Sequence, residues 1–317
     1  MIVLLSEYLS EWLDSKALTL ERSTYEAYMI YINRHMIPYF EEKKIELEKL
    51  KAKQVLEYCQ YLQRYGRTDG KGGLSNVSVK KHLCVLKQAL NDAVIYEYID
   101  HNPALPVKLP RVAVLTNDIY FLTLEEAQKV INAFDGHNLK PVVVLALYYG
   151  LRRSEVLGLR WSAVDFERDT ITINHTVVKN LTIIEKDRTK TETSRRTFEL
   201  LPECREMLKA LKASQNASKS KNKDGYIFCW EDGRLFRPDY VTRGFQRVLK
   251  SHGLPHMRFH DLRHSTASIL FEKGWSLEDV KNWLGHSDIE TTSNIYLHYG
   301  RSRKIMLAND MKNMFKI

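Results

Sequence analysis

The sequence lacks several signals that would assign it to a common functional class. Its cysteines are few and widely spaced, with no Cys-x-x-Cys pair, so neither a disulfide framework nor a cysteine zinc site is expected. No Gly-x-x-x-x-Gly-Lys-Ser/Thr loop is present, which argues against a P-loop nucleotide site. No cluster of metal-ligating residues stands out either. We therefore expect no cofactor and no metal.

Long apolar runs are also missing. The best run, Val142 to Leu147, is far too short to cross a membrane. The N-terminus has no basic segment followed by a long apolar core, so no signal peptide is expected. These absences, together with cysteines that read as reduced thiols, predict a cytoplasmic protein with no membrane partner.

Positive charge is in excess. The 317 residues include 48 Lys and Arg against 39 Asp and Glu, giving a formal charge of +9 and a pI near 9.2. This balance favours an anionic partner, double-stranded DNA first, although a merely basic soluble protein would show it too. The length suggests two domains, and a hydrophobic content of 44% is enough to form their cores.

The first third of the chain predicts a small all-helical domain. Apolar residues follow a helical period at 4–13, from 23 to 36 before Pro38, at 53–65 and at 75–95, with a polar, glycine-rich loop at 67–73. Five cations on this loop and the helices beside it either form a solvated surface or follow a DNA backbone. They are Arg64, Arg67, Lys71, Lys80 and Lys81.

Three prolines between residues 102 and 110 mark a linker. We expect domains at 1–102 and 119–317, joined by a linker at 103–118. The second domain predicts helices at 123–134, 141–150, 202–211 and 240–249, and one starting at Ser154. Residues 170–173, 176–184 and 197–200 predict a small antiparallel sheet with a basic turn. The fold class is mainly α with a small antiparallel β-sheet (α+β).

Several short motifs combine cations, imidazoles and a tyrosine. In order, they are Gly-Leu-Arg-Arg-Ser-Glu at 150–155, Lys190 after the strands, His-Asp-Leu-Arg-His at 260–264, Leu-Gly-His-Ser at 284–287, and Thr-Thr-Ser-Asn-Ile-Tyr-Leu-His at 291–298. Arginine and histidine donors suit a phosphate, and a tyrosine can serve as a covalent nucleophile. Each motif alone fits an ordinary surface pair or packing residue, so only the ordered set indicates a site.

The ordered set resembles the tyrosine recombinase family, specifically phage and conjugative-transposon integrases, over residues 1 to 310. The resemblance implies a helical core-binding (SAM-like) domain, a catalytic domain, and DNA cleavage and rejoining through a 3′-phosphotyrosine. It also implies the role of each matching residue: Arg152 and Arg263 clamp the scissile phosphate, Lys190 is the general acid, His260 and His286 are supporting donors, Tyr296 is the nucleophile, and Glu155 buttresses Arg152.

The resemblance further implies a homotetramer on DNA that integrates and excises a mobile element. The arm-binding domain of larger relatives is expected to be absent. The apolar tail series (Ile305, Met306, Met311, Met314, Phe315) predicts a helix that either docks on another protomer or caps its own core. The alternatives are a type IB topoisomerase-like or resolvase activity, and a non-catalytic DNA-binding protein derived from an integrase.

Overall fold

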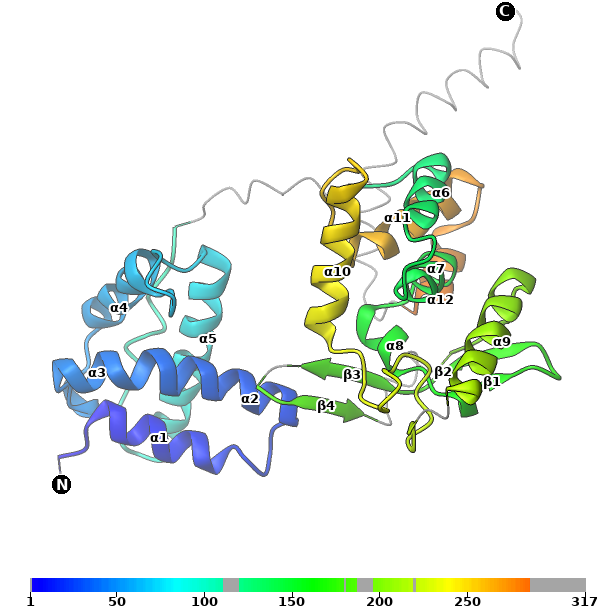
Figure 1. Cartoon of the computed structure of the whole chain (residues 1–317). Helices are drawn as coiled ribbons and strands as arrows, with labels where there is room; N and C mark the ends of the chain where they lie inside the picture. The colour runs from blue at the N-terminus through cyan, green and yellow to red at the C-terminus, as the bar shows by residue number, and fades with distance from the viewer. Residues whose placement is uncertain (1, 111–119, 180, 187–195, 219–220, 286–317) are drawn as a thin grey trace, which may run out of the picture. The chain divides into compact units, whose positions relative to one another are not determined.

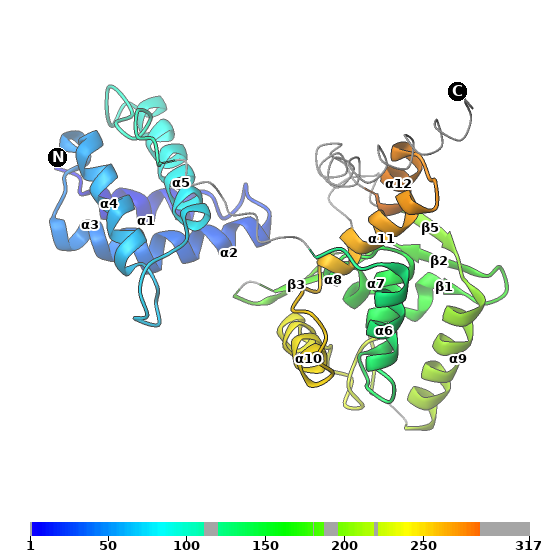
Figure 2. The same ribbon diagram turned by 90° about the horizontal axis from the view of Figure 1, so that it is seen from above.

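The computed structural model describes residues 2–110, 120–179, 181–186, 196–218 and 221–285 (Figures 1 and 2). Contacts along the chain divide it into a first unit, 1–115 with 180–182, and a second unit, 116–179 with 183–317. The described residues are mainly helical, with a few short antiparallel strands, so the predicted fold class is confirmed. Within the described ranges, no helix has both the length and the apolar character needed to span a membrane.

The first unit consists of helices that bury one apolar face each. Helix α1, for example, buries Leu5, Tyr8, Leu9 and Trp12, the spacing expected of an amphipathic helix. Helix α5 begins at Ser75, whose hydroxyl accepts a hydrogen bond from the Ser78 amide. The elements are α1 (Leu5–Ser15), α2 (Arg22–Tyr31), a π-helical turn (Ile32–Met36), α3 (Ile37–Lys43), a 3₁₀ turn (Leu47–Lys49), α4 (Ala52–Tyr65) and α5 (Asn76–Ile95).

Pro38 does not end the second helical segment, as its position had suggested. The chain passes through the π-helical turn and continues as α3, with Pro38 in the first turn of the new helix. A proline is tolerated there because the first amides of a helix have no intrahelical acceptor.

The segment assigned to a linker begins by packing on the first unit. Ala104 and Val107 are buried in its core, together with residues of α1, α4 and α5. The Lys87 ammonium donates to the carbonyls of Leu105 and Val107, and the Asn102 side chain donates to the Lys87 carbonyl. The prolines break the helix here, but the backbone that follows is still held by α5.

The second unit combines helices with two separate antiparallel sheets (Figure 2). Strand β2 pairs with both β1 and β5, whereas β3 and β4 form a hairpin of their own. The elements are α6 (Leu124–Ala133), α7 (Lys140–Tyr148), α8 (Arg153–Gly158), a 3₁₀ turn (Trp161–Ala163), β1 (Val164–Asp165), β2 (Thr170–Ile173), β3 (Thr176–Lys179), β4 (Ile183–Lys186), β5 (Arg196–Glu199), α9 (Pro202–Ala217), α10 (Pro238–Ser251), α11 (Asp261–Glu272) and α12 (Leu277–Leu284).

The prediction of one sheet was wrong because the chain turns away after β2. His175, between β2 and β3, is buried, and its ring nitrogen lies 2.8 Å from the Tyr226 hydroxyl. Helix α8 packs on β3 so closely that a Cβ on Gly158 would lie 2.4 Å from the His175 carbonyl oxygen. These contacts join residues far apart in sequence. The alternation of apolar and polar residues within each strand therefore could not show that the strands form two sheets.

The ends of three other helices meet just after helix α7. Its residues Val142 to Leu147 are buried, and α11 packs against both α7 and α12. Gly150 follows α7 with φ of +60°, and a Cβ there would lie 2.2 Å from Leu284 Cδ2. The start of α8, the first turn of α11 and the end of α12 therefore meet at this glycine.

Candidate active site

The centre of the site is the Glu155 carboxylate, which is 2% exposed. Arg152 donates to it twice, through its backbone amide at 2.8 Å and through Nη1 at 2.7 Å. Arg196 donates to both oxygens, at 2.9 Å through Nη2 and 3.3 Å through Nη1. Nη1 of Arg263 lies 3.9 Å from Glu155 Oε2. We call Arg152, Glu155, Arg196 and Arg263 the arginine cluster.

The charge on Glu155 is set by these neighbours. Burial alone would raise the pKa of its carboxyl group, but Arg196 first, and then Arg152 and Arg263, lower that pKa to about 2. Glu155 is therefore ionised at neutral pH. Three guanidinium groups around one carboxylate leave a net charge of +2, which suits an anion with several oxygens.

Arg263 is held by backbone carbonyls. Its side chain is 1% exposed, and it donates through Nη1 to the Gly150 carbonyl at 2.6 Å and through Nη2 to the Leu284 carbonyl at 2.7 Å. Burial lowers its pKa, and Arg152 adds to this effect, whereas Glu155 opposes it. The Arg152 side chain is 33% exposed, so it is the more accessible of the two.

His260 precedes α11, and its ring meets the ring of His264 edge-on at 5.0 Å. Although the residue as a whole is exposed, burial of its ring first, and then His264, Arg263 and Arg152, lower its pKa to about 4. The imidazole is therefore neutral at pH 7 and can accept a proton.

The structure brings together Arg152, Glu155 and Arg263 as the motifs predicted. His260 is close enough for both arginines to lower its pKa. Lys190, His286 and Tyr296 lie outside the described residues. Sequence reasoning missed Arg196, the first residue of β5. Its only signal was its place in a basic turn before an alternating strand, and Arg195 shares that signal.

The five candidate DNA contacts all lie exposed on the first unit: Arg64 at the end of α4, Arg67 and Lys71 in the following loop, and Lys80 and Lys81 on α5. Arg67 is paired with Asp69, through Nη2 at 2.6 Å and Nε at 3.0 Å. A phosphate would have to compete with this carboxylate for Arg67, whereas no ion pair is recorded in the described ranges for the other four.

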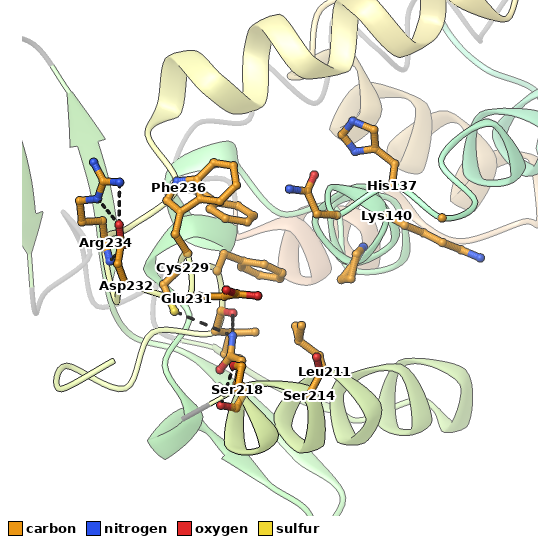
Figure 3. Close-up of a pocket in the computed structure, with 17 residues that line it drawn as sticks. His137, Lys140, Leu211, Ser214, Ser218, Cys229, Glu231, Asp232, Arg234 and Phe236 are labelled. Atoms are coloured by element: carbon orange, nitrogen blue, oxygen red, sulfur yellow. Dashed lines mark hydrogen bonds and ion pairs between the residues drawn. The ribbon is translucent and has the colours of Figure 1, made fainter. Parts of the chain in front are cut away.

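A cavity of about 790 Å³ lies elsewhere in the second unit (Figure 3). It is formed by α9, the segment between α6 and α7, and residues 227–236, and its described lining includes no member of the arginine cluster. Among the described residues, no group of three or more His, Cys, Asp or Glu could hold a metal ion.

Known protein families match most of the chain. The phage integrase family matches residues 120–303, and the phage integrase SAM-like domain matches residues 4–108. A tyrosine recombinase XerC-like protein of Caldanaerobacter subterraneus subsp. tengcongensis is 31% identical over 277 residues, which cover 80% of this chain and 70% of that protein.

Two solved structures have a similar fold. The first is a Tn1549 transposon integrase in complex with a circular intermediate DNA, with a TM-score of 0.77 and 18% identity, covering 97% of this chain and 100% of that one. The second is a lambda integrase tetramer bound to a Holliday junction, with a TM-score of 0.68 and 19% identity, covering 93% of this chain and 77% of that one.

Proposed function

Since the chain belongs to the phage integrase family and is a tyrosine-type site-specific recombinase, we propose that its arginine cluster binds the DNA phosphate that is cleaved and rejoined. The observation that supports this most directly is the buried Glu155 surrounded by three guanidinium groups. A phosphodiester repels nucleophiles because of its charge, and guanidinium donors on its non-bridging oxygens favour the pentacoordinate transition state.

In the proposed reaction, the Tyr296 oxygen attacks the phosphorus and forms a 3′-phosphotyrosine while the bond to the 5′-oxygen breaks. Lys190 gives a proton to the leaving 5′-oxygen, and neutral His260 can take the proton from the tyrosine. His286 is a further donor to the phosphate. Attack by a 5′-hydroxyl reverses the step, so the bond energy is kept and rejoining needs no ATP.

Arginine suits the clamp better than lysine. Its planar fork matches two phosphate oxygens and stays charged at any relevant pH. Glu155 takes one edge of the Arg152 fork through Nη1. Nη2 of Arg152 reaches the Gly285 carbonyl only at 3.5 Å, a weak contact that a phosphate oxygen can replace.

The exposed cations of the first unit are the proposed contacts to the DNA backbone, and the partner is double-stranded DNA carrying the element's core sites. We further propose that four protomers assemble on two duplexes to integrate and excise a mobile element. The lambda integrase tetramer on a Holliday junction is the precedent for this assembly.

The apolar tail beyond Tyr296 is proposed to dock on a neighbouring protomer. The large cavity of the second unit is a candidate receptor: Figure 3 displays Leu211 and Phe236 among its lining, with the acids Glu231 and Asp232 at the same pocket. The acids would complement the three lysines of the tail, Lys304, Lys312 and Lys316, which would compete for Asp232 with Arg234 of the same lining. Deletion after Arg303 tests the idea. The truncated protein should fold and bind DNA but fail in synapsis; unfolding, or intact synapsis, would refute docking in trans.

A nicked suicide substrate tests the cleavage activity itself. Loss of the short fragment beyond the nick traps the covalent intermediate, so the protein should become attached to a 3′-phosphate in the presence of EDTA and without ATP. Binding without an adduct would instead identify a non-catalytic DNA-binding protein. Relaxation of supercoiled DNA that needs no specific site would favour the topoisomerase-like alternative.

A further inference from the structure

Among the neighbours of Glu155, Arg196 does most to lower the pKa of its carboxyl group, although no motif pointed to it. Its side chain is 8% exposed, and it donates to both carboxylate oxygens at 2.9 and 3.3 Å. Its guanidinium carbon lies 5.5 Å from the centre of the Phe198 ring. Arg196 is thus fixed between a buried carboxylate and an aromatic ring, facing inward from the start of β5.

The same side chain lies against Gly285, the residue that follows α12. Gly285 caps that helix with φ of +66°, and a Cβ there would lie 2.9 Å from Arg196 Nη1 and 3.3 Å from its Cδ. A side chain at 285 would therefore require the Arg196 guanidinium to shift. Arg196 therefore packs against the backbone at Gly285, the residue that precedes His286 in the sequence.

The three arginines share this short segment. Arg263 donates to the Leu284 carbonyl and Arg152 reaches the Gly285 carbonyl, while Arg196 packs beneath the Gly285 Cα. The carboxylate that holds Arg152 and the backbone at Gly285 thus both lie against one buried guanidinium.

Charge balance shows what Arg196 contributes. With it, three guanidinium groups face one carboxylate, and a net +2 remains for a bound anion. Without Arg196, the two remaining guanidinium groups and the Glu155 carboxylate would have a net charge of only +1. The carboxylate would also lose two of its hydrogen bonds, which Arg152 or Arg263 would have to replace.

We propose that Arg196 is a positioning residue for the phosphate chemistry: it neutralises Glu155 and supports Gly285, so that Arg152 and Arg263 keep their charge for the scissile phosphate. This inference rests on the proposed function of the arginine cluster. Because its side chain is 8% exposed and is directed at Glu155, Arg196 is assigned a positioning role and not direct contact with the phosphate.

The proposal predicts a defect that depends on the charge of the substrate. A methylphosphonate at the scissile position replaces one non-bridging oxygen with a methyl group and removes the negative charge of the diester. A site that has lost one positive charge should be slow on the diester and less impaired on the methylphosphonate. A site that is merely misfolded should be equally slow on both.

The experiment measures single-turnover cleavage of matched diester and methylphosphonate suicide substrates by the full-length protein. Arg196→Gln should slow diester cleavage by about 10²-fold, the typical effect of losing one transition-state contact, and methylphosphonate cleavage by less than about 10-fold. Arg196→Lys, which keeps the charge, should recover most of the diester rate. Arg205→Met removes an arginine paired with Asp169 elsewhere in the unit, and should leave both rates unchanged.

Equal slowing on the two substrates, no slowing on either, or no recovery by Arg196→Lys would overturn the proposal. If Arg196→Gln does not fold, Arg196→Met is compared on the same substrates, because it is also neutral and can pack on Phe198. Failure of the proposed function would look different, since the unmodified protein would then form no adduct with the diester.

Discussion

The two units carry their positive charge in opposite ways. In the first unit, Lys80 and Lys81 stand exposed on α5, and no ion pair is recorded for them among the described residues. In the second unit, Arg196 and Arg263 are 8% and 1% exposed and are held around a carboxylate. Exposed cations contribute separately and weaken with salt, whereas buried ones depend on each other for charge balance and hydrogen bonds.

This difference predicts which substitutions each unit tolerates. Changing one exposed lysine removes one phosphate contact and leaves its neighbours in place. Changing one member of the arginine cluster leaves its partners buried with unbalanced charge. DNA binding through the first unit should therefore weaken in small steps as exposed cations are removed. Cleavage by the second unit should be largely lost on a single substitution in the arginine cluster.

The largest effect is expected at the centre of the cluster. Glu155→Gln removes the one negative charge among three guanidinium groups, and losing one partner of a buried pair typically costs about 3–5 kcal/mol. Urea unfolding followed by tryptophan fluorescence would measure it, since four of the five tryptophans lie in the second unit. Glu203→Gln, an exposed change on α9, is the control. A loss below about 1 kcal/mol would mean that the cluster is not mutually dependent.

The next effect separates charge from geometry in the same cluster. Arg152→Lys keeps the positive charge but loses the two-pronged fork, so cleavage should fall by about 10²-fold while DNA binding stays close to normal. The folding cost should be small because the Arg152 side chain is 33% exposed. Suicide-substrate cleavage and filter binding on the same preparation measure the two quantities. Near-normal cleavage would remove Arg152 from the clamp.

The first unit also buries a titratable side chain, but this one is a neutral imidazole. His82 is 2% exposed, its Nδ1 lies 3.2 Å from the Tyr58 hydroxyl, and the ring of His35 is 4.8 Å away. Burial first, and then His35, lowers the pKa of His82 to about 3. In the unfolded chain, the His82 ring binds a proton near pH 6.5. Its contribution to the free energy of unfolding is therefore complete above that pH and is lost as the pH falls toward 3.

At pH 5 the expected loss from His82 is about 2 kcal/mol relative to pH 7. Hydrogen exchange of α5 peptides at the two pH values, corrected for intrinsic rates, would report it. His82→Gln should largely remove the difference. If this variant shows the same loss as the unmodified chain, His82 is not its source.

The smallest effect belongs to the exposed cations. Combined Lys80→Gln and Lys81→Gln should lower the log-log salt dependence of DNA binding by up to about 0.9 for each lost phosphate contact. Cleavage by the saturated complex should not change. Lys43→Gln, an exposed lysine on α3 that pairs with Glu42, serves as the control. An unchanged slope would place the DNA contacts on another surface of the unit.

The sequence was most informative where a feature is local. Helix α5 was predicted over 75–95 and is observed over Asn76–Ile95, because its apolar period and its Ser75 cap lie within one segment. The Arg152–Glu155 pair was likewise visible at i,i+3 on one helical turn.

Features that depend on distant contacts were not predictable. Arg196 meets Glu155 across 41 residues, and the sequence pattern gave no reason to choose it over the neighbouring Arg195. The separation of the β3–β4 hairpin depends on the contact between His175 and Tyr226, 51 residues apart. Burial of Ala104 after the proline-rich break depends on packing against α5 and the rest of the first core.

The central claim is that the cation-rich site serves a tyrosine nucleophile, and the most direct measurement is the identity of the residue joined to DNA. The covalent complex trapped on a nicked substrate would be digested and its nucleotide-bearing peptide sequenced by mass spectrometry. We expect the phosphate on Tyr296, and no adduct at all from Tyr296→Phe, which should still bind DNA. A phosphate on Tyr299, the nearest alternative tyrosine, or an adduct that survives in Tyr296→Phe, would contradict this assignment.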